Sequence, residues 1–452
     1  MTLPIEHPEE TDLSTAPPPE SSGIEQRIER EPNRLKRCWL ILGPGLTAGA
    51  SNNDPSAIAT FVQAGAGTGF ALLWVAPVVF PMMATAVYLC AKLGMVSGRG
   101  LAGVLRERFG RGVLYPVVGC LVLANTFNAG ADIGAVAAGL HLVIPVSIPV
   151  LIVIVTALLM ATQIWASYRL ISNLFKWLTF ALFAFIAAGF MSQPALREVL
   201  RHTFVPTFSA DPQFVSTLVA IVGATLSPYL YFWQTSQRVE EEKCMGRRSL
   251  WQRIGATEGE LKYATLDVNV GMFFAFLIIY FIILTTGATL HQHPETRTVE
   301  TAVQAASALA PLAGPAAKYL FALGFIGAGL LAVPVLTAGA AYAITESLGL
   351  PQGLDLRFRQ GKAFYLAIVG CTLAGMVISL SGWSPMRVLF WAAVINGLLA
   401  GPLLVLILWA SNSRRIVGDK ANRMGINVLG GITALAAFAA AACFLVTLVH
   451  RR

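Results

Sequence analysis

Two aspartates of the sequence, Asp54 and Asp132, stand in apolar stretches long enough to cross a membrane. Of the 24 acidic residues, we place only these two well inside such stretches. A charged side chain at the centre of a bilayer costs roughly 2.5 to 3.5 kcal/mol on insertion scales, so a carboxylate retained there indicates a function. The run SNNDPSA around Asp54 contains no Lys, Arg or His. A carboxylate among neutral oxygens, without a resident cation, predicts a site for a cation.

The predicted ligands of this cation are all oxygen atoms. Carboxylate, carbonyl and water oxygens suit Mg²⁺, Mn²⁺ and Ca²⁺, whereas softer metals prefer thiolate, thioether or imidazole. The six histidines stand in tails, loops or span ends, and the six scattered cysteines show no CxxC spacing. The candidate ligands are the side chains of Ser51, Asn52, Asn53, Asp54, Ser227 and Asn396 and the carbonyls around Ala57 and Ala224.

The composition of the 452 residues predicts that these ligands are carried by membrane helices. Apolar residues make up 56% of the chain and charged residues 12%, about half of the charge fraction of a soluble domain. Windows of about 20 apolar residues predict about eleven transmembrane helices. We place them at 39–64, 69–91, 112–140, 142–161, 171–191, 214–236, 264–288, 317–345, 363–381, 388–410 and 425–448.

The first and sixth spans are both interrupted by a proline, Pro55 and Pro228. Proline lacks an amide donor and disfavours helix in the preceding residue, so each span should consist of two half-helices joined by an unwound turn. Unwound backbone at membrane depth requires a protein or water-filled environment. The two breaks occupy the same position in successive groups of five spans, which is typical of an inverted-repeat transporter with its substrate between the breaks.

The loops predict the topology and the division of the chain. Most of the 32 Lys and Arg residues fall on the side of the N-terminus, which the positive-inside rule makes cytoplasmic. With an odd number of spans the C-terminus lies outside the cell membrane. We divide the chain into a disordered tail (1–37), a first five-helix repeat (38–191), an extracellular loop (192–213), a second repeat (214–410), and an eleventh helix with the C-terminus (411–452).

The runs GPGLTAGASNNDPSAIAT and GATLSPYLYFWQ at the two breaks resemble the broken helices of the natural resistance-associated macrophage protein (NRAMP) family of divalent-metal transporters. The resemblance extends from about 38 to 450. It implies an all-α polytopic membrane protein with the LeuT-type 5+5 inverted repeat. In that family the first helix carries D-P-G-N, the sixth A-x-x-M-P-H, and the third D-L-A-E, and Mn²⁺ or Fe²⁺ moves with protons.

This sequence departs from those motifs at the ligand positions. The Asn position of the first motif is Ala57, and the Met and His positions of the second are Ser227 and Tyr229. The third-span motif reads DIGA from Asp132, which lacks the second carboxylate. These changes resemble the NRAMP-related magnesium transporter branch, which is uncoupled from protons. Mg²⁺ keeps several waters, and smaller side chains leave room for a partly hydrated ion.

The resulting hypothesis is import of Mg²⁺, and also Mn²⁺, by alternating access without proton coupling. One alternative is a proton-coupled Mn²⁺/Fe²⁺ symporter, and another is a Na⁺-coupled organic solute carrier of the same fold. No HExxH motif, activated nucleophile or phosphate loop predicts an enzyme. We expect no cofactor, no nucleic acid and no obligate protein partner, so the partners are the divalent cation and the lipid bilayer.

Several further residues are expected to line the permeation route. Asp132 has a second interpretation, as a structural carboxylate hydrogen-bonded to Asn125, Asn128 or a facing hydroxyl. The polar residues after the second break could also be ordinary residues of a cytoplasmic helix end. The expected lining residues are Ser51, Asn53, Asp132, Tyr229, Gln234 and Asn396.

Overall fold

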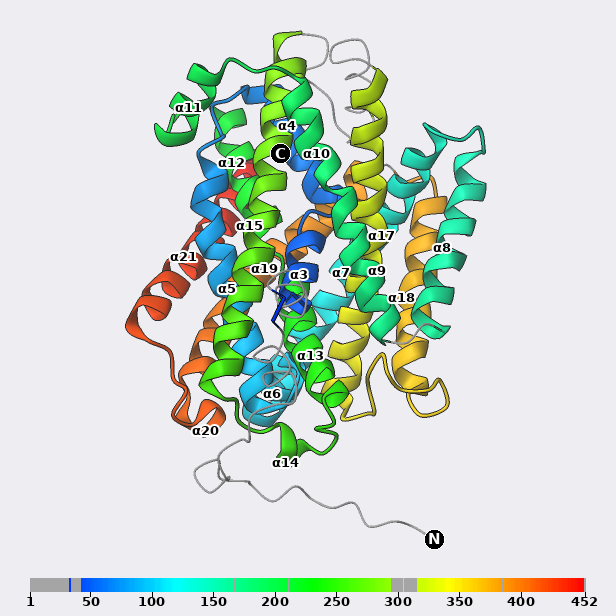
Figure 1. Ribbon diagram of the computed structural model, residues 1–452, viewed down its shortest axis with the longest axis vertical. Coiled ribbons are helices and arrows are strands. Elements are labelled where there is room, and N and C mark those ends of the chain that lie inside the picture. The colour runs from blue at the N-terminus through cyan, green and yellow to red at the C-terminus, as the bar shows by residue number, and fades with distance from the viewer. Residues whose placement is uncertain are drawn as a thin grey trace.

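Long helices form the regular structure of the described residues, which are 32–33, 42–165, 168–209, 211–293, 304, 315–383 and 385–450. The computed structural model arranges them as one bundle of mostly upright helices (Figure 1). The predicted tail, 1–37, lies outside the described residues except for 32–33. The helices of the first half are α3 (Pro44–Ser51), α4 (Pro55–Thr68), α5 (Val75–Ser97), α6 (Leu101–Arg108), α7 (Arg111–His141), α8 (Ile148–Trp165), α9 (Tyr168–Ala181), α10 (Phe183–Met191) and α11 (Leu196–Phe204).

The second half begins with the helix pair α12 (Pro212–Thr225) and α13 (Pro228–Cys244), which repeats the division seen in α3 and α4. The helices that follow are α14 (Leu250–Arg253), α15 (Glu258–Thr289) with the 3₁₀ turn η2 (Leu290–Gln292), α17 (Pro315–Leu348), α18 (Lys362–Leu380), α19 (Pro385–Asn412), α20 (Arg414–Val417) and α21 (Met424–His450). Both prolines that begin α4 and α13 stand in the first helical turn, where the missing amide removes no helical hydrogen bond.

The number of continuous spans differs from the predicted eleven. Among the described helices nine are long and apolar enough to cross a bilayer, or ten if the pair Trp177–Met191 and Leu196–Phe204, bent by 120°, is one span. The predicted span 39–64 is divided into α3, with 8 residues, and α4, with 14. Neither half has the roughly 20 residues of a continuous span. The broken first span therefore accounts for one of the two missing spans, and the division of the predicted fifth span into α9 and α10 accounts for the other.

Three of the predicted spans begin at another residue than expected. The second span begins at Val75 instead of 69, after a series of turns. The fourth begins at Ile148 instead of 142, because Pro145 cannot donate a helical amide bond. The seventh begins at Glu258 instead of 264, where Thr257 and Glu260 form a capping box. This earlier start places Asp267 in the interior of α15, so a third carboxylate lies inside the bundle.

The bundle has two distinct ends. The short helices α6, α14 and α20 lie at one end, which we call the α6 end, and α11 lies at the opposite end, the α11 end (Figure 1). Half-helices α4 and α12 lie toward the α11 end, and α13 extends toward the α6 end. Basic residues of the short helices gather at the α6 end: Arg106, Arg108, Arg253, Arg414 and Arg415.

Helices α3 and α15 meet backbone to backbone. A Cβ atom on Gly49 would lie 2.0 Å from the carbonyl oxygen of Gly271, and one on Gly271 would lie 2.1 Å from the carbonyl oxygen of Gly45. Because both obstacles are backbone atoms, they cannot rotate aside as a side chain would. Small residues allow such close helix approach within a membrane. The glycines therefore determine how tightly α3 lies on α15.

We expect Gly271→Ala to destabilise the protein by about 3 kcal/mol, because the added methyl forces α3 away from α15. Gly119→Ala in α7 is the matched control, since a Cβ there meets no atom within 4 Å. In a helix that change should be neutral or stabilise by about 0.5–1 kcal/mol. Thermal unfolding in detergent, followed by size-exclusion chromatography, measures both. Equal midpoints for the two variants would contradict the close contact.

Candidate functional site

The first break joins α3 and α4 through Asn52, Asn53 and Asp54. Asp54 is the N-cap of α4 in an extended conformation (φ −65°, ψ 163°). Its Oδ1 accepts hydrogen bonds from the amide of Ala57 at 2.7 Å and from the hydroxyl of Ser56 at 2.5 Å. This is the usual way in which an aspartate satisfies the first amides of a helix. The carboxylate is 3% exposed and has no ion-pair partner among the described residues.

The second break joins α12 and α13 through Leu226 and Ser227. Ser227 is the N-cap of α13 (φ −79°, ψ 122°), but its side chain does not cap that helix. Its Oγ instead donates to the carbonyl oxygen of Ala224 at 2.9 Å. The predicted breaks at Pro55 and Pro228 are therefore both confirmed.

The two breaks expose equivalent carbonyl oxygens, those of Ser51 and Ala224. Each belongs to the residue four positions before the proline, whose missing amide would have been its helical donor. In both cases a hydroxyl from the second break takes that place. Tyr229 Oη donates to the Ser51 oxygen at 2.7 Å, and Ser227 Oγ donates to the Ala224 oxygen. Tyr229 Oη also lies 3.4 Å from Asp54 Oδ2, so it connects the two breaks.

A cavity of about 1160 Å³ reaches both breaks from the α11 end. Its walls come from α4, α7, α12, α19 and α21, and its lining extends to the start of α12 at Pro212. Among the described residues that line it, two are carboxylates, Asp54 and Asp211, and none is Lys, Arg or His. The remaining polar lining consists mainly of hydroxyl and amide groups, together with the indole of Trp391 and the thiol of Cys443. The cavity therefore offers oxygen ligands to a cation and no competing positive charge.

The sequence profile of the natural resistance-associated macrophage protein-like family, Nramp, matches residues 45–447. The chain belongs to this family. The chain is similar over nearly its whole length to two divalent metal cation transporters named MntH. The MntH of Verminephrobacter eiseniae is 29% identical, and the match covers 93% of this chain and 92% of the relative. The MntH of Klebsiella pneumoniae strain 342 is 28% identical, and the match covers 91% of this chain and 94% of the relative. We conclude that this Nramp-family chain is a multi-pass membrane transporter of a divalent metal cation and not an enzyme.

Solved structures show the same fold. The manganese transporter of Eremococcus coleocola has a TM-score of 0.73 at 19% identity, over 97% of this chain and 90% of that chain. A nucleobase-cation-symport-1 family transporter has a TM-score of 0.56 at 14% identity, over 89% and 92%. The predicted LeuT-type arrangement with two broken helices is thereby confirmed for this Nramp-family chain.

The structure brings some of the predicted site residues to the cavity and places others behind it. Those that line the cavity are Asp54, Ala224, Ser227 and Asn396. Those that are buried outside the lining are Ser51, Asn53, Ala57, Tyr229, Asp132 and Gln234. Ala57 differs most from expectation. Its carbonyl was predicted as a cation ligand, whereas the structure shows its amide donating a hydrogen bond to Asp54.

Asp132 lies on α7, fully buried, and in the described part of the chain its carboxylate makes no hydrogen bond of normal geometry, although the backbone of Ser56 lies close to it. The interpretation as a carboxylate bonded to Asn125 or Asn128 is therefore wrong for this structure. Asn125 donates to the carbonyl of Leu336 instead, at 2.9 Å. Asp132 is close enough to Asp54 for the two to interact electrostatically. An unpaired carboxylate at this depth requires a proton or a cation nearby.

Three residues of the site were missed by sequence reasoning. Ser56 binds Asp54 and lines the cavity, and its position directly after Pro55 could have revealed it. Asn128 lines the cavity one helical turn before Asp132, on the same face of α7. Met83 of α5 accepts a hydrogen bond at its Sδ from the Asn52 amide at 3.1 Å. A thioether therefore reaches the first break, although it does not line the cavity.

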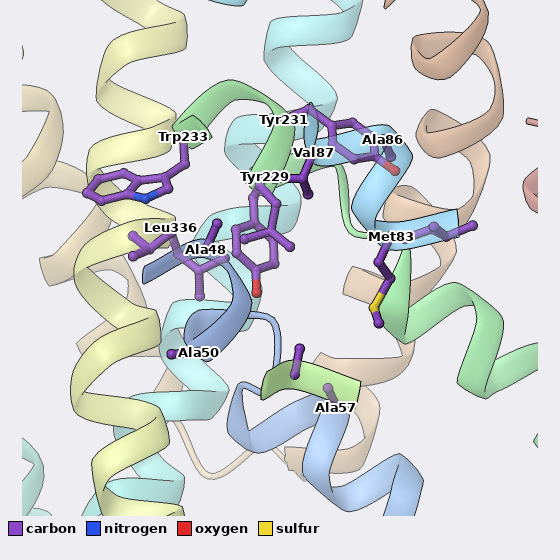
Figure 2. Packing of buried hydrophobic residues seen from close by; sticks show 14 of the residues in the cluster. Ala48, Ala50, Ala57, Met83, Ala86, Val87, Tyr229, Tyr231, Trp233 and Leu336 are labelled. Carbon is purple, nitrogen blue, oxygen red and sulfur yellow. The ribbon is translucent and has the colours of Figure 1, made fainter. Parts of the chain in front are cut away.

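The route is closed on the side of the α6 end. Tyr229, Tyr231 and Trp233 of α13 are buried and pack against residues of α3, α5 and α17, such as Ala48, Val87 and Leu336 (Figure 2). Gln234 is completely buried, and both polar atoms of its amide lack a partner. In the described residues the cavity therefore lies on the α11 side of the breaks, and the α6 side is filled by packed side chains.

We expect Tyr229→Phe to lower the stability of the metal-free protein by about 1–3 kcal/mol, because the Ser51 carbonyl would remain buried without a donor. Tyr115→Phe is the matched control, since Tyr115 is exposed on α7. Thermal unfolding without divalent metal measures the difference. A Tyr229→Phe midpoint equal to that of the control would show that the hydroxyl does not hold the break.

Proposed function

We propose that this transporter imports Mg²⁺, and also Mn²⁺, by alternating access and without obligatory proton coupling. The observation that carries the proposal is the donor set at the meeting point of the two breaks. In the described lining it comprises a carboxylate, hydroxyls, amides and a carbonyl, with no thioether or imidazole. Hard cations such as Mg²⁺ prefer these oxygen ligands. The proposal places the chain in the magnesium-transporting branch of its family.

Asp54 is the principal ligand in this proposal, through Oδ2. Its Oδ1 is occupied by Ser56 and Ala57, whereas Oδ2 has only the long contact with Tyr229 at 3.4 Å. A cation could replace that contact without unwinding α4. Ser227 Oγ and the Ala224 carbonyl supply ligands from the second break. Ala57 takes part through its amide, which holds the carboxylate in place.

Retained hydration supports Mg²⁺ as the substrate. Mg²⁺ gives up its waters reluctantly and is usually bound through one or two carboxylates. The cavity volume of about 1160 Å³ is far larger than the roughly 30 Å³ that one water occupies in the liquid. Asn128 and Asn396 offer amide groups on the walls. These amides would hold the outer waters of the ion.

The membrane potential is sufficient to drive entry. The basic residues of α6, α14 and α20 support a cytoplasmic α6 end under the positive-inside rule. The cavity then opens to the outside of the plasma membrane, and the N-terminus is cytoplasmic. A divalent ion gains about 4.6 kcal/mol per 100 mV of inside-negative potential. Import therefore needs no second ion.

Proton-coupled Mn²⁺ or Fe²⁺ import is the second candidate, and Asp132 favours it. The carboxylate is buried, unpaired in the described chain and electrostatically coupled to Asp54. It could bind a proton that moves with the metal. A Na⁺-coupled organic solute carrier is less favoured, because the two relatives named above are both divalent metal cation transporters. Flux of Mg²⁺, Mn²⁺ and Ca²⁺ into liposomes with a trapped pH dye separates these candidates.

We expect Asp54→Ala to reduce Mg²⁺ uptake to the level of protein-free liposomes, because the charged ligand is lost. The control is Asp419→Ala, which removes an exposed carboxylate between α20 and α21. Uptake into proteoliposomes is measured together with the thermal midpoint of each variant. Normal flux in Asp54→Ala would refute the site.

We expect Ser227→Met to increase the preference for Mn²⁺ or Cd²⁺ over Mg²⁺ by about tenfold, since a thioether favours softer metals. Ser216→Met controls for the added volume, because Ser216 lines the same cavity away from the break. Competition between the metals for uptake gives the ratio. An unchanged ratio in Ser227→Met would mean that selectivity lies elsewhere.

A further inference from the structure

Asp267 of α15 caps a helix to which it does not belong. Its carboxylate is fully buried and accepts three backbone amides at the start of α3. Oδ1 accepts from Gly43 at 2.8 Å and from Leu46 at 3.1 Å, and Oδ2 accepts from Gly45 at 2.7 Å. The N-cap of α3 is Gly43, which has no side chain to do this. The N-terminal amides of α3 therefore depend on a residue more than two hundred positions away.

The same carboxylate also holds α13. Arg238 donates from Nη2 to Asp267 Oδ2 at 2.5 Å and from Nη1 to Glu241 at 2.7 Å. The side chains of Arg238 and Asp267 are 5% and 0% exposed. A charge-assisted pair shielded from water is stronger than a surface pair, and removing one partner leaves the other charge buried. Asp267 thus joins one half-helix of each broken span to α15, and we call this group of contacts the Asp267 clamp.

Among the described residues, the half-helices toward the α11 end are not capped by a carboxylate from another helix, although α4 also approaches α15 closely at Gly65 and its Ala66 carbonyl contacts His291. Helix α4 is capped by its own Asp54 and α12 by its own Asp211, whose side chain accepts from Phe214. Both helices could move as units and keep their caps. Helix α3, in contrast, would lose the Asp267 cap if it moved away from α15. It also packs directly on the backbone of α15 at Gly271. The closed side of the molecule is therefore held by contacts between helices.

We propose that Asp267 is a positioning residue for transport, which keeps the α6 end closed by clamping α3 and α13 together. Opening toward the α6 end requires that the carboxylate release the amides of α3. The proposal rests on the alternating access proposed above, but not on the identity of the transported ion. Loss of one or two charge-assisted hydrogen bonds shifts such an equilibrium by roughly 10- to 100-fold.

The test measures access to α3 through a single reporter thiol. Ala48→Cys places the thiol on α3 at a buried position beside Leu336 and Tyr229 (Figure 2). The six native cysteines are replaced by serine or alanine in the full-length protein. The labelling rate with N-ethylmaleimide is measured in liposomes without divalent metal. We expect Asp267→Asn to increase the rate roughly 10- to 100-fold, because the neutral amide holds neither Arg238 nor all three backbone amides.

Two further variants and a second reporter keep the result interpretable. Glu258→Gln on the same helix removes an exposed pair with Lys420 and should leave the rate unchanged. Arg238→Gln releases α13 and retains Asp267, so it should raise the rate even where Asp267→Asn does not fold. Ala341→Cys, buried in α17, reports general loosening and should label as slowly in the variants as in the parent.

The outcomes separate a clamp from a structural role. Faster labelling at Ala48→Cys alone supports the proposal. Unchanged labelling at Ala48→Cys in both clamp variants overturns it, as does an equal increase at Ala341→Cys. Because the labelling is done without metal, absence of Mg²⁺ flux in the parent protein would refute the proposed substrate and leave the clamp result standing.

Discussion

The structure depends on two backbone hydrogen bonds that proline makes impossible. Pro55 and Pro228 leave the carbonyls of Ser51 and Ala224 without helical donors at membrane depth, where water cannot replace them. The hydroxyls of Tyr229 and Ser227 satisfy both oxygens. The same constraint turns Asp54 into a helix cap and directs its carboxylate to the junction of four half-helices. The proposed cation site thus follows from the requirement that these broken helix ends be satisfied.

The two sides of the site are stabilised differently. Toward the α11 end the half-helices are capped by their own aspartates and border a cavity with polar walls. Toward the α6 end α13 has buried polar groups without partners in the described residues, including the whole amide of Gln234. Buried polar groups of this kind are costly. Water entering from the α6 end would bind these groups and relieve that cost. This gain opposes the Asp267 clamp, so it brings the conformations that are closed and open at the α6 end closer in free energy.

The fold was largely predictable from local sequence, and the full site was not. Apolar windows located the helices, and the prolines located both breaks, because a missing amide acts on its own helix wherever it lies. Which side chains face the cavity depends on helix rotation, which neighbouring helices determine. For this reason Ser56 and Asn128 were missed, and Ala57, whose carbonyl was predicted as a ligand, lies in α4 outside the lining of the cavity. Asp267 was missed because it stands in the first turn of the predicted span 264–288. In the structure α15 begins at Glu258, so Asp267 lies well inside the helix.

Selectivity must then arise from geometry as well as from ligand type. Met83 brings a sulfur atom to the first break, but its Sδ is engaged by Asn52 and lies outside the lining of the cavity. A soft ligand is therefore near the site and yet withheld from it in this conformation. If the first break unwound far enough to expose Met83, softer metals would gain a ligand that Mg²⁺ does not use. In the proposed Mg²⁺ site, the contact between Asn52 and Met83 would favour hard ions by holding the thioether outside the lining of the cavity.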